Sequence, residues 1–440
     1  MEEWKAPRGR QRAARRSRIG DGSIARPRCG GSSRTGRRLP HRTVFPCATQ
    51  VVAGRSLRLS HCPCQSPCQS FGVLQVPALK IVLLNPPHRS IGSRVPGELL
   101  PPLGLLTIGG LLIDAGHAVR LVNADIAPMT VTEILSDLRR DLPDALLLGH
   151  SGSTSAHPAV LDITAAVRAE WPAMTIIYGG VHPTYHWAEI LRAAPQIDVI
   201  VRGEGEVTTP ALFDAIVSGR TLDNVPGLAL RRTGHPVATR PAEMLRDLES
   251  TRIGWELVDF AEHSSWGGKR SVIMQFSRGG PHLRTYCGQR GFWTRWRHRD
   301  PVAFAKENAW LHREKGVDLI NLADENPTSS RKVWKAFLEA LVAESVPVLI
   351  VGSTRADDIV RDADILPLYK KAGCLRILLG LEGTDEATLQ KVRKGGNRAK
   401  GQQAIHLLRA HGMIGLATFA VSFEEETDGD YLQLLRHLRA

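Results

Sequence analysis

Short apolar runs alternate with amphipathic segments along residues 79–217. The runs LKIVLLNPP, AVRLVNAD, DALLLGHSGS, MTIIYGGVHP and IDVIVRGEGE are rich in aliphatic residues, as expected for strands covered on both faces. Helical spacing lies between or after them, in LTIGGLLIDAGH and near 131–140, 158–170 and 206–217. We therefore predict an α/β unit over 78–222 that is built on a doubly wound parallel sheet.

A second alternation begins after a polar linker at 223–264, in which the residues around Gly234 predict a hairpin. Strands are predicted at 271–276, 319–324, 346–352, 375–380 and 415–421, with helices near 301–314, 330–343, 357–372, 385–394 and 401–411. Such repeats predict a parallel (β/α) barrel. Because only five strands are predicted before Ala440, we expect residues 265–440 to form an incomplete partial barrel, truncated at its C-terminus.

Polar and glycine-rich loops follow the predicted strands of the first unit. Ligands of doubly wound sheets bind beyond the carboxyl ends of the strands, so these loops are expected to share one site. Glycines let the backbone approach a large ligand, and hydroxyl groups can donate hydrogen bonds to it. The candidate binding residues are Asn85, Asp125, Ser151, Ser153, Thr154, Gly179, Gly180, His182, Glu204 and Gly205. For His182, as for His150, a hydrogen-bonding role within its loop is the competing interpretation.

Polar residues also gather at the carboxyl ends of the predicted barrel strands, where barrel enzymes place their active groups. They are Asp324, Glu325, Asn326, Ser353, Thr354, Arg355, Glu382 and Glu424 to Glu426. Clustering of this kind indicates a site and not a core.

The charge of the chain is concentrated at its N-terminus. Residues 1–70 contain 15 of the 57 basic residues but only three of the 44 acidic residues. The folded part is therefore nearly neutral, which argues against a nucleic-acid partner. Residues 1–77 show no apolar period, so we expect a disordered basic extension or sequence upstream of the true start. A transit peptide is the alternative.

Cysteine usage and hydropathy favour a cytoplasmic protein. Five of the seven cysteines lie in the N-terminal extension, and only Cys287 and Cys374 lie in the predicted folded part, so no disulfide framework is expected. The longest apolar run, at 103–113, is much shorter than the roughly 20 residues that cross a bilayer.

The motifs NPP, PPLGLLTIGGLL, GGVHPT and DVIVRGEGE together resemble the cobalamin-binding domain that is fused to radical S-adenosylmethionine (SAM) enzymes. That resemblance implies a flavodoxin-like fold and assigns cobalamin to the candidate residues of the first unit. Other cobalamin proteins supply a cobalt-binding histidine from a D-x-H-x-x-G motif. If Asp125 is the first residue of that motif, Ala127 occupies the histidine position, so no protein histidine is expected on cobalt.

The segments LADENPT, GSTRADDIVRDADIL, LGLEGTDEATLQKVRKGG and GQRGFWTRWRHRDP resemble the anaerobic magnesium-protoporphyrin IX monomethyl ester oxidative cyclases, which form the fifth ring in bacteriochlorophyll synthesis. The resemblance covers nearly all of 79–440. It implies a radical SAM oxidoreductase with cobalamin, SAM and a [4Fe–4S] cluster, a porphyrin substrate and an electron-donor protein. The residues assigned to SAM are Tyr286, Asp324, Glu325, Asn326, Ser353, Arg355 and Glu382.

The cluster motif of that family is broken in this sequence. Its CPHRCTYC segment aligns with GPHLRTYC, so Cys287 matches the third cysteine while Gly280 and Arg284 occupy the other two positions. Glycine has no side-chain donor and arginine stays protonated, whereas such clusters need thiolates. Cys374 begins the fourth predicted strand, at the opposite end of the barrel, and does not substitute. We expect a protein that is inactive as written.

Three functions remain open at this stage. The first is a cyclase-family protein without activity, and the second is a cobalamin-dependent radical SAM methyltransferase, which shares the architecture. The third is a non-catalytic corrinoid-binding protein that retains only the function of the first unit.

Overall fold

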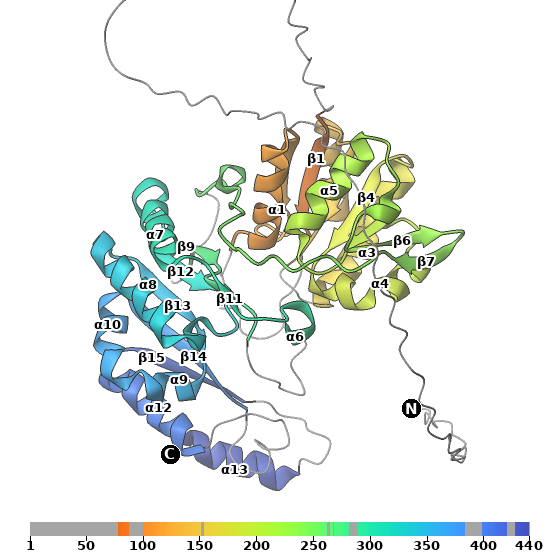
Figure 1. The fold of residues 1–440 in the computed structure, drawn as a ribbon. Coiled ribbons are helices and arrows are strands. Elements are labelled where there is room, and N and C mark those ends of the chain that lie inside the picture. The colour runs from red at the N-terminus through yellow and green to blue at the C-terminus, as the bar shows by residue number, and fades with distance from the viewer. Residues whose placement is uncertain are drawn as a thin grey trace, which may run out of the picture. The chain divides into compact units, whose positions relative to one another are not determined.

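The computed structural model describes residues 78–87, 100–150, 154–261, 265–266, 268–280, 289–382, 398–419 and 427–439. Residues Gly72–Ala440 form one compact unit. Within this unit, two β-sheets each carry their own helices (Figure 1). The extension predicted for residues 1–77 lies outside the described residues.

The first sheet has the strand order β2-β1-β3-β4-β5-β6-β7. Its parallel strands are β1 (Lys80–Asn85), β2 (Ala118–Asn123), β3 (Ala145–Leu148), β4 (Thr175–Gly179) and β5 (Val199–Val201). The order 2-1-3-4-5 is the flavodoxin-like arrangement. The predicted doubly wound parallel sheet is therefore confirmed.

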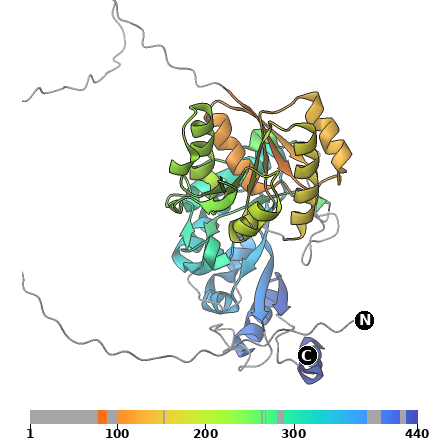
Figure 2. The same ribbon diagram turned by 90° about the vertical axis from the view of Figure 1, so that its right-hand side faces the viewer.

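Two layers of helices cover this sheet (Figure 2). They are α1 (Leu103–Asp114), α2 (Val131–Arg140), α3 (His157–Glu170), α4 (Val181–Ala193) and α5 (Gly205–Val217). Helices α1 and α5 share one apolar core with the sheet, and α2, α3 and α4 share another on the opposite face. Both faces are thus buried, which explains why the strands are continuously apolar.

The sequence analysis did not identify α4. Its residues VHPTYHWAEILRA combine an early proline with aromatic residues and histidines, all weak helix formers, and His186 departs from helical geometry within it. The apolar run before it also extends past β4 in the sequence, which hides the boundary between strand and helix.

The hairpin predicted around Gly234 is confirmed, and it extends the first sheet. Strand β6 (Leu228–Arg232) pairs antiparallel with β5 and with β7 (His235–Ala238). Thr233 and Gly234 join them with φ angles of 46° and 82°. Two positive φ angles are what a tight hairpin turn requires.

The second sheet has the order β15-β14-β13-β12-β9-β8. The strands β9 (Lys269–Met274), β12 (Leu319–Leu322), β13 (Leu349–Thr354), β14 (Cys374–Glu382) and β15 (Ile414–Phe419) are parallel, while β8 (Ser265–Trp266) pairs antiparallel at one edge. All five predicted strands are confirmed. A short antiparallel ladder, β10 (Ser277–Arg278) with β11 (Arg297–His298), follows β9.

Helices pack along this second sheet (Figure 1). They are α7 (Pro301–Lys315), α8 (Arg331–Glu344), α9 (Ala356–Arg361), α10 (Leu366–Lys371) and α12 (Arg398–Ala410). Two further helices, α6 (Gln289–Phe292) and α13 (Asp428–Arg439), contribute no described residue to this core. Single 3₁₀ turns lie at Thr154–Ala156, Leu222–Asn224, Trp255–Leu257, Pro327–Ser329 and Ala363–Ile365. The helix predicted near 385–394 lies outside the described residues.

The single helix predicted over 357–372 is wrong in one respect, because the structure divides it into α9, a 3₁₀ turn and α10. Asp362 lies at the break and is fully buried. Its carboxylate accepts hydrogen bonds from Arg361 and from the Tyr369 hydroxyl. Those contacts, with Pro367 at the start of α10, fix the interruption.

Candidate functional site

One cavity of about 500 Å³ is walled by the carboxyl ends of strands from both sheets. The first sheet contributes the ends of β3, β4 and β5 and the first turns of α1 and α5. The second contributes residues after β9 and β12 and parts of β13 and β14. Both edges that the sequence marked as polar therefore open into the same space.

Glycines line the cavity where α4 and α5 begin. Gly180 has a φ of 114° and a ψ of −172°, a conformation that is essentially restricted to glycine. A Cβ atom on Gly205 would lie 2.9 Å from Cδ1 of Ile108. These residues leave backbone exposed to a ligand, which fits a large cofactor such as a corrinoid.

The structure places the candidate cobalamin residues differently. Asn85, Gly179, Gly180, Glu204 and Gly205 lie on the cavity wall, as does His150. Asp125, Thr154 and His182 do not line it, and Ser151 and Ser153 lie outside the described residues. Asn85 on the wall donates a hydrogen bond to Oδ1 of Asn123 (2.8 Å). This bond connects the carboxyl ends of β1 and β2.

His182 lies in a cluster of aromatic rings next to β4. Its ring packs on His157 (4.5 Å between centroids) and on His186 (4.6 Å). Burial, together with the neighbouring His157 and His186, lowers the pKa of His182 to about 4. The imidazole is therefore neutral near pH 7. Sequence reasoning missed His157, which stands 25 residues before His182 with no local pattern to connect them.

Asp324, assigned to SAM from the resemblance, binds the chain's own backbone. Its buried carboxylate accepts hydrogen bonds from the Phe276 N–H (2.9 Å), the Ser277 N–H and the Ser277 hydroxyl (2.6 Å). Burial raises its pKa to about 7, although the three hydrogen bonds act in the opposite direction. Asp324 thus fastens the segment that leads into the cluster-motif loop.

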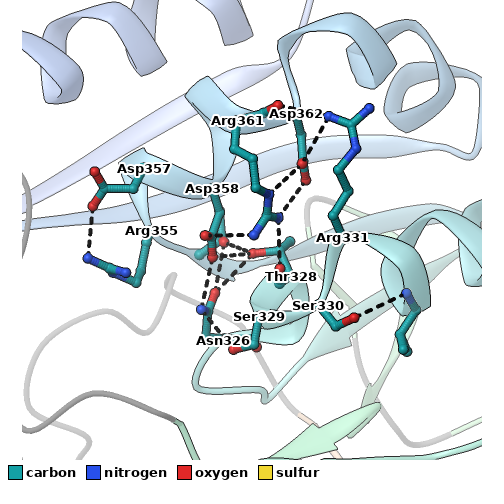
Figure 3. A network of polar contacts seen from close by, with 12 residues as sticks. Asn326, Thr328, Ser329, Ser330, Arg331, Arg355, Asp357, Asp358, Arg361 and Asp362 are labelled. Atoms are coloured by element: carbon teal, nitrogen blue, oxygen red, sulfur yellow. Dashed lines mark hydrogen bonds and ion pairs between the residues drawn. The ribbon is translucent and has the colours of Figure 1, made fainter.

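Asn326 is also occupied within the protein (Figure 3). Its amide donates to Asp358 (2.9 Å) and Ser329 (3.0 Å), and its side-chain oxygen accepts from the hydroxyl groups of Thr328 and Thr354. Arg361 in turn pairs with Asp358. This network ties the loop after β12 to α9, and every hydrogen-bonding group of the Asn326 side chain has a partner in it.

The other residues assigned to SAM divide into three groups. Glu325 and Ser353 lie on the cavity wall. Arg355 pairs with Asp357 (2.8 Å), which also binds Lys400. Tyr286 and the side chain of Glu382 lie outside the described residues, as do Arg284 and Cys287 of the cluster motif. On the wall, sequence reasoning missed Gln275, Arg278 and Arg376; the last is a charge inside an apolar strand run, which is a usable signal.

Gly280, at the first cluster position, is described. Its φ is not positive, and a Cβ atom placed on it would meet no heavy atom of the described residues within 4 Å. The position therefore has room for a cysteine side chain that the sequence does not supply. Cys374 is buried at the start of β14, and burial raises its pKa to about 12, so its thiol is neutral and does not replace a missing thiolate.

Two arginines that flank the cluster-motif loop bind carboxylates of the first sheet. Arg278 contacts Glu204 (3.3 Å) and Glu206 (2.5 Å), and Arg297 contacts Glu204 (2.6 Å). The carboxylate of Glu204 is thus held by guanidinium groups, although the residue was a candidate for cobalamin. Sequence reasoning missed both arginines because the partners lie 74 and 93 residues apart.

Family comparisons divide the chain in the same way as the two sheets. Residues 90–213 match the B12 binding domain, and residues 274–438 match the radical SAM superfamily. Among solved structures, the cobalamin-dependent SAM radical enzyme OxsB with aqua-cobalamin and SAM bound is similar, with a TM-score of 0.66 and 19% identity over 81% of this chain and 51% of that one. The radical SAM methyltransferase TsrM from Kitasatospora setae has a TM-score of 0.67 and 16% identity over 82% and 71%.

These matches define a protein in which a B12-binding module precedes a radical SAM module. The sequence is 55% identical to an anaerobic magnesium-protoporphyrin IX monomethyl ester cyclase of Synechocystis sp., over 82% of this chain and 72% of the relative. It is 31% identical to a cyclase of the same name from Rubrivivax gelatinosus, over 79% of this chain and 63% of the relative. The chain belongs to the anaerobic magnesium-protoporphyrin IX monomethyl ester cyclase family, which confirms the resemblance.

Cobalamin, SAM and a [4Fe–4S] cluster are the cofactors expected for this family. The glycine-lined edge of the first sheet fits the first of them. The cluster positions do not fit the third, because Gly280 and Arg284 occupy two of the three ligand positions. Within the described residues, no helix has both the length and the apolar character needed to cross a bilayer.

Proposed function

We propose that this chain is a cobalamin-binding protein of the cyclase family whose cavity accepts a magnesium-porphyrin monomethyl ester. The observation that carries the proposal is the single cavity of about 500 Å³ shared by the two strand edges. The name of the 55% identical relative supplies the substrate class. An electron-donor protein as partner, a cytoplasmic location and the division at 78–222, 223–264 and 265–440 stay predictions.

Within this proposal, Asn85, Gly179, Gly180 and Gly205 hold cobalamin, and Glu325 and Ser353 contact SAM. Corrinoid cofactors supply methyl-transfer and one-electron chemistry when bound. The protein's own contribution is a wall of glycine backbone on one side and polar strand ends on the other. Ala127 at the histidine position supports a cobalt centre without a protein imidazole ligand.

We further propose that the chain as written assembles no [4Fe–4S] cluster, and hence lacks cyclase activity. Gly280 and Arg284 carry this part of the proposal. The same observation favours a second function of another class, a corrinoid-binding protein without catalysis. The methyltransferase alternative has weaker support, from relatives such as an uncharacterized methyltransferase of Pyrococcus horikoshii at 26% identity.

The test is a titration of the full chain with hydroxocobalamin, followed by absorbance, and then EPR spectroscopy of the reduced complex. Binding is expected, without nitrogen superhyperfine splitting from a protein imidazole. Absence of binding would refute both the cyclase-type and the corrinoid-carrier functions. Splitting from an imidazole would refute the role given to Ala127. Product analysis after repair of the cluster motif would separate cyclase from methyltransferase.

A further inference from the structure

A buried ion-pair cluster joins the first sheet to the segment 277–298, which carries the cluster-motif loop. Glu204 and Glu206, in the turn after β5 and the start of α5, face Arg278 in β10 and Arg297 in β11. Exposed fractions of the four side chains are only 7%, 7%, 11% and 9%. Two cations thus meet two anions away from water, where each charge needs its partners.

Glu204 is the central member of this cluster. Its two oxygens receive NH1 and NH2 of Arg297 (3.0 and 2.6 Å), and one also receives NH1 of Arg278 (3.3 Å). Arg278 further binds Gln275 and stacks over the Trp293 ring at 4.9 Å. Because a guanidinium group donates hydrogen bonds in a fixed planar fork, these contacts hold both arginines in one orientation.

The ion-pair cluster continues into the glycine-lined cavity wall. The backbone N–H of Gly203 donates to the hydroxyl of Thr184 (2.9 Å), and that hydroxyl donates to the carbonyl of Gly180 (2.7 Å). Gly180, Gly203 and Glu204 all line the cavity. A continuous series of contacts thus runs from the turn before α4 to the β10–β11 ladder.

On its other side, the segment is fastened to the second sheet. Asp324 holds Phe276 and Ser277, directly before Arg278. The start of the cluster-motif loop is therefore attached to both edges of the cavity, by a carboxylate from each sheet.

We propose that Glu204 is a positioning residue: it binds Arg278 and Arg297, so that a corrinoid at the first edge stabilises strands β10 and β11 at the second. The proposal rests on the proposed cobalamin site for its ligand. The coupling is reciprocal, so stabilisation of the two strands also strengthens corrinoid binding. This assigns to Glu204 of the RGEGE motif a role in joining the two halves of the site, in place of direct cofactor contact.

The first test needs no cofactor. In the full chain, Glu204→Gln keeps the shape of the side chain but leaves Arg297 without an anionic partner at that oxygen pair. Hydrogen–deuterium exchange of the β10 and β11 amides is expected to accelerate roughly tenfold or more. Arg278→Lys, which keeps the charge but not the forked contact, is expected to give a smaller acceleration at the same amides.

A matched control is Glu249→Gln. Glu249 also holds a forked arginine, Arg299, with contacts of 2.8 and 3.0 Å, but has no contact with Arg278 or Arg297. It should leave exchange at β10 unchanged. Amides of β12, inside the second sheet, report on global unfolding and should stay protected in every variant.

The second test adds hydroxocobalamin. In the wild-type chain, hydroxocobalamin should slow hydrogen–deuterium exchange of the β10 and β11 amides. This slowing should be lost in Glu204→Gln. It should also be lost in Thr184→Val, a variant that keeps the ion pairs of Glu204. Corrinoid affinity should fall roughly fivefold or more in Glu204→Gln, through the same coupling. Unchanged exchange in Glu204→Gln without cofactor would overturn the positioning role. Slowing that persists in both variants would overturn the coupling. A wild-type chain that binds no corrinoid would refute the proposed cofactor site, and the first test alone would then decide whether Glu204 positions β10 and β11.

Discussion

The two strand edges that wall the cavity use their polar residues in opposite ways. At the first sheet, the wall combines backbone at Gly179, Gly180 and Gly205 with polar side chains such as Asn85 and His150. At the second sheet, Glu325 and Ser353 lie on the wall, whereas Asp324 and Asn326 do not line the cavity and are occupied by internal contacts. The first edge is shaped for a ligand, whereas the second is built to hold a loop.

This difference bears on the proposed loss of two cluster ligands, because the contacts that hold the flanking strands do not use the proposed ligand positions. The loop is fastened from outside the motif, by Asp324 on one side and Glu204 on the other. Neither contact involves the ligand positions. The frame can therefore persist although Gly280 and Arg284 replace two thiolates.

The largest effect is expected from repair of the second edge. The unmodified chain should form no [4Fe–4S] cluster on anaerobic reconstitution with iron and sulfide, whereas Gly280→Cys with Arg284→Cys should form one. Space for the first cysteine is present, since Gly280 has no positive φ and no described residue near a Cβ. Iron content and charge-transfer absorbance measure the outcome. Each single replacement serves as the control and should do much less.

A stoichiometric cluster in the unmodified chain would contradict this account and would require a ligand outside the motif. If the double variant takes up no iron, the loop has lost more than its two thiolates.

The second prediction concerns the pH dependence that Asp324 gives to stability. Its pKa of about 7 in the folded state lies above the ordinary value of 3.8, so the folded state binds more protons between about pH 4 and 7. Stability should therefore fall as pH rises through that window, by up to about 4 kcal/mol from this group. Urea unfolding from pH 4 to 8 measures the pH dependence of stability, and Asp324→Asn should remove this falling contribution.

Asp162→Asn, at an exposed position on α3, is the control for loss of one carboxylate. A wild-type stability that rises across the whole window, with the same slope in Asp324→Asn, would show that Asp324 is charged throughout.

The sequence predicts a helix or strand of this protein well where neighbouring residues alone carry the pattern of that element. Helix α2 lies where a helix was predicted, near 131–140, and in the structure Thr130 and Glu133 form a capping box at its start. Helix α4 was not predicted, since Gly180 and the following His-Pro give no helical period. Local pattern thus specified most strands and helices, but not where weak helix formers are held by tertiary packing.

The candidate site was predicted less well for a different reason. A polar residue at a strand end is visible in the sequence, but whether its partners are internal is not. In the sequence, Asp324 and Asn326 resemble ligand-binding residues. In the structure, they are hydrogen-bonded to Ser277 and Asp358, respectively. The pairing of Glu204 with Arg297 spans 93 residues, and no local pattern encodes it.

The third prediction tests the ligand-shaped edge. Gly180→Ala places a side chain at a φ of 114° and should cost about 1–3 kcal/mol of stability. It should also weaken hydroxocobalamin binding, because the turn forms the cavity wall. The adjacent Gly179→Ala is the matched control: its Cβ would lie 3.7 Å from Val201, an ordinary contact, so its stability should stay near wild type. Equal stability of the two variants, measured by urea unfolding, would contradict the assigned backbone conformation.

The fourth prediction concerns His182, beside the first edge, whose effect on the pH dependence of stability has a sign opposite to that of Asp324. The pKa of His182 is lowered from 6.5 to about 4 by burial and by His157 and His186, while Glu189 acts in the other direction. The unfolded chain therefore binds more protons between about pH 4 and 6.5, so this group makes stability rise with pH across that window, by up to about 3 kcal/mol. His182→Gln should remove that rise, whereas His235→Gln, an exposed histidine on β7, should not. Because the contributions of His182 and Asp324 oppose each other below pH 6.5, the wild-type profile should be flatter than that of either variant. If the stability of His182→Gln depends on pH in the same way as that of the wild type, the imidazole of His182 is solvated and its pKa is not lowered. Only Asp324, at the second edge, would then contribute to the pH dependence.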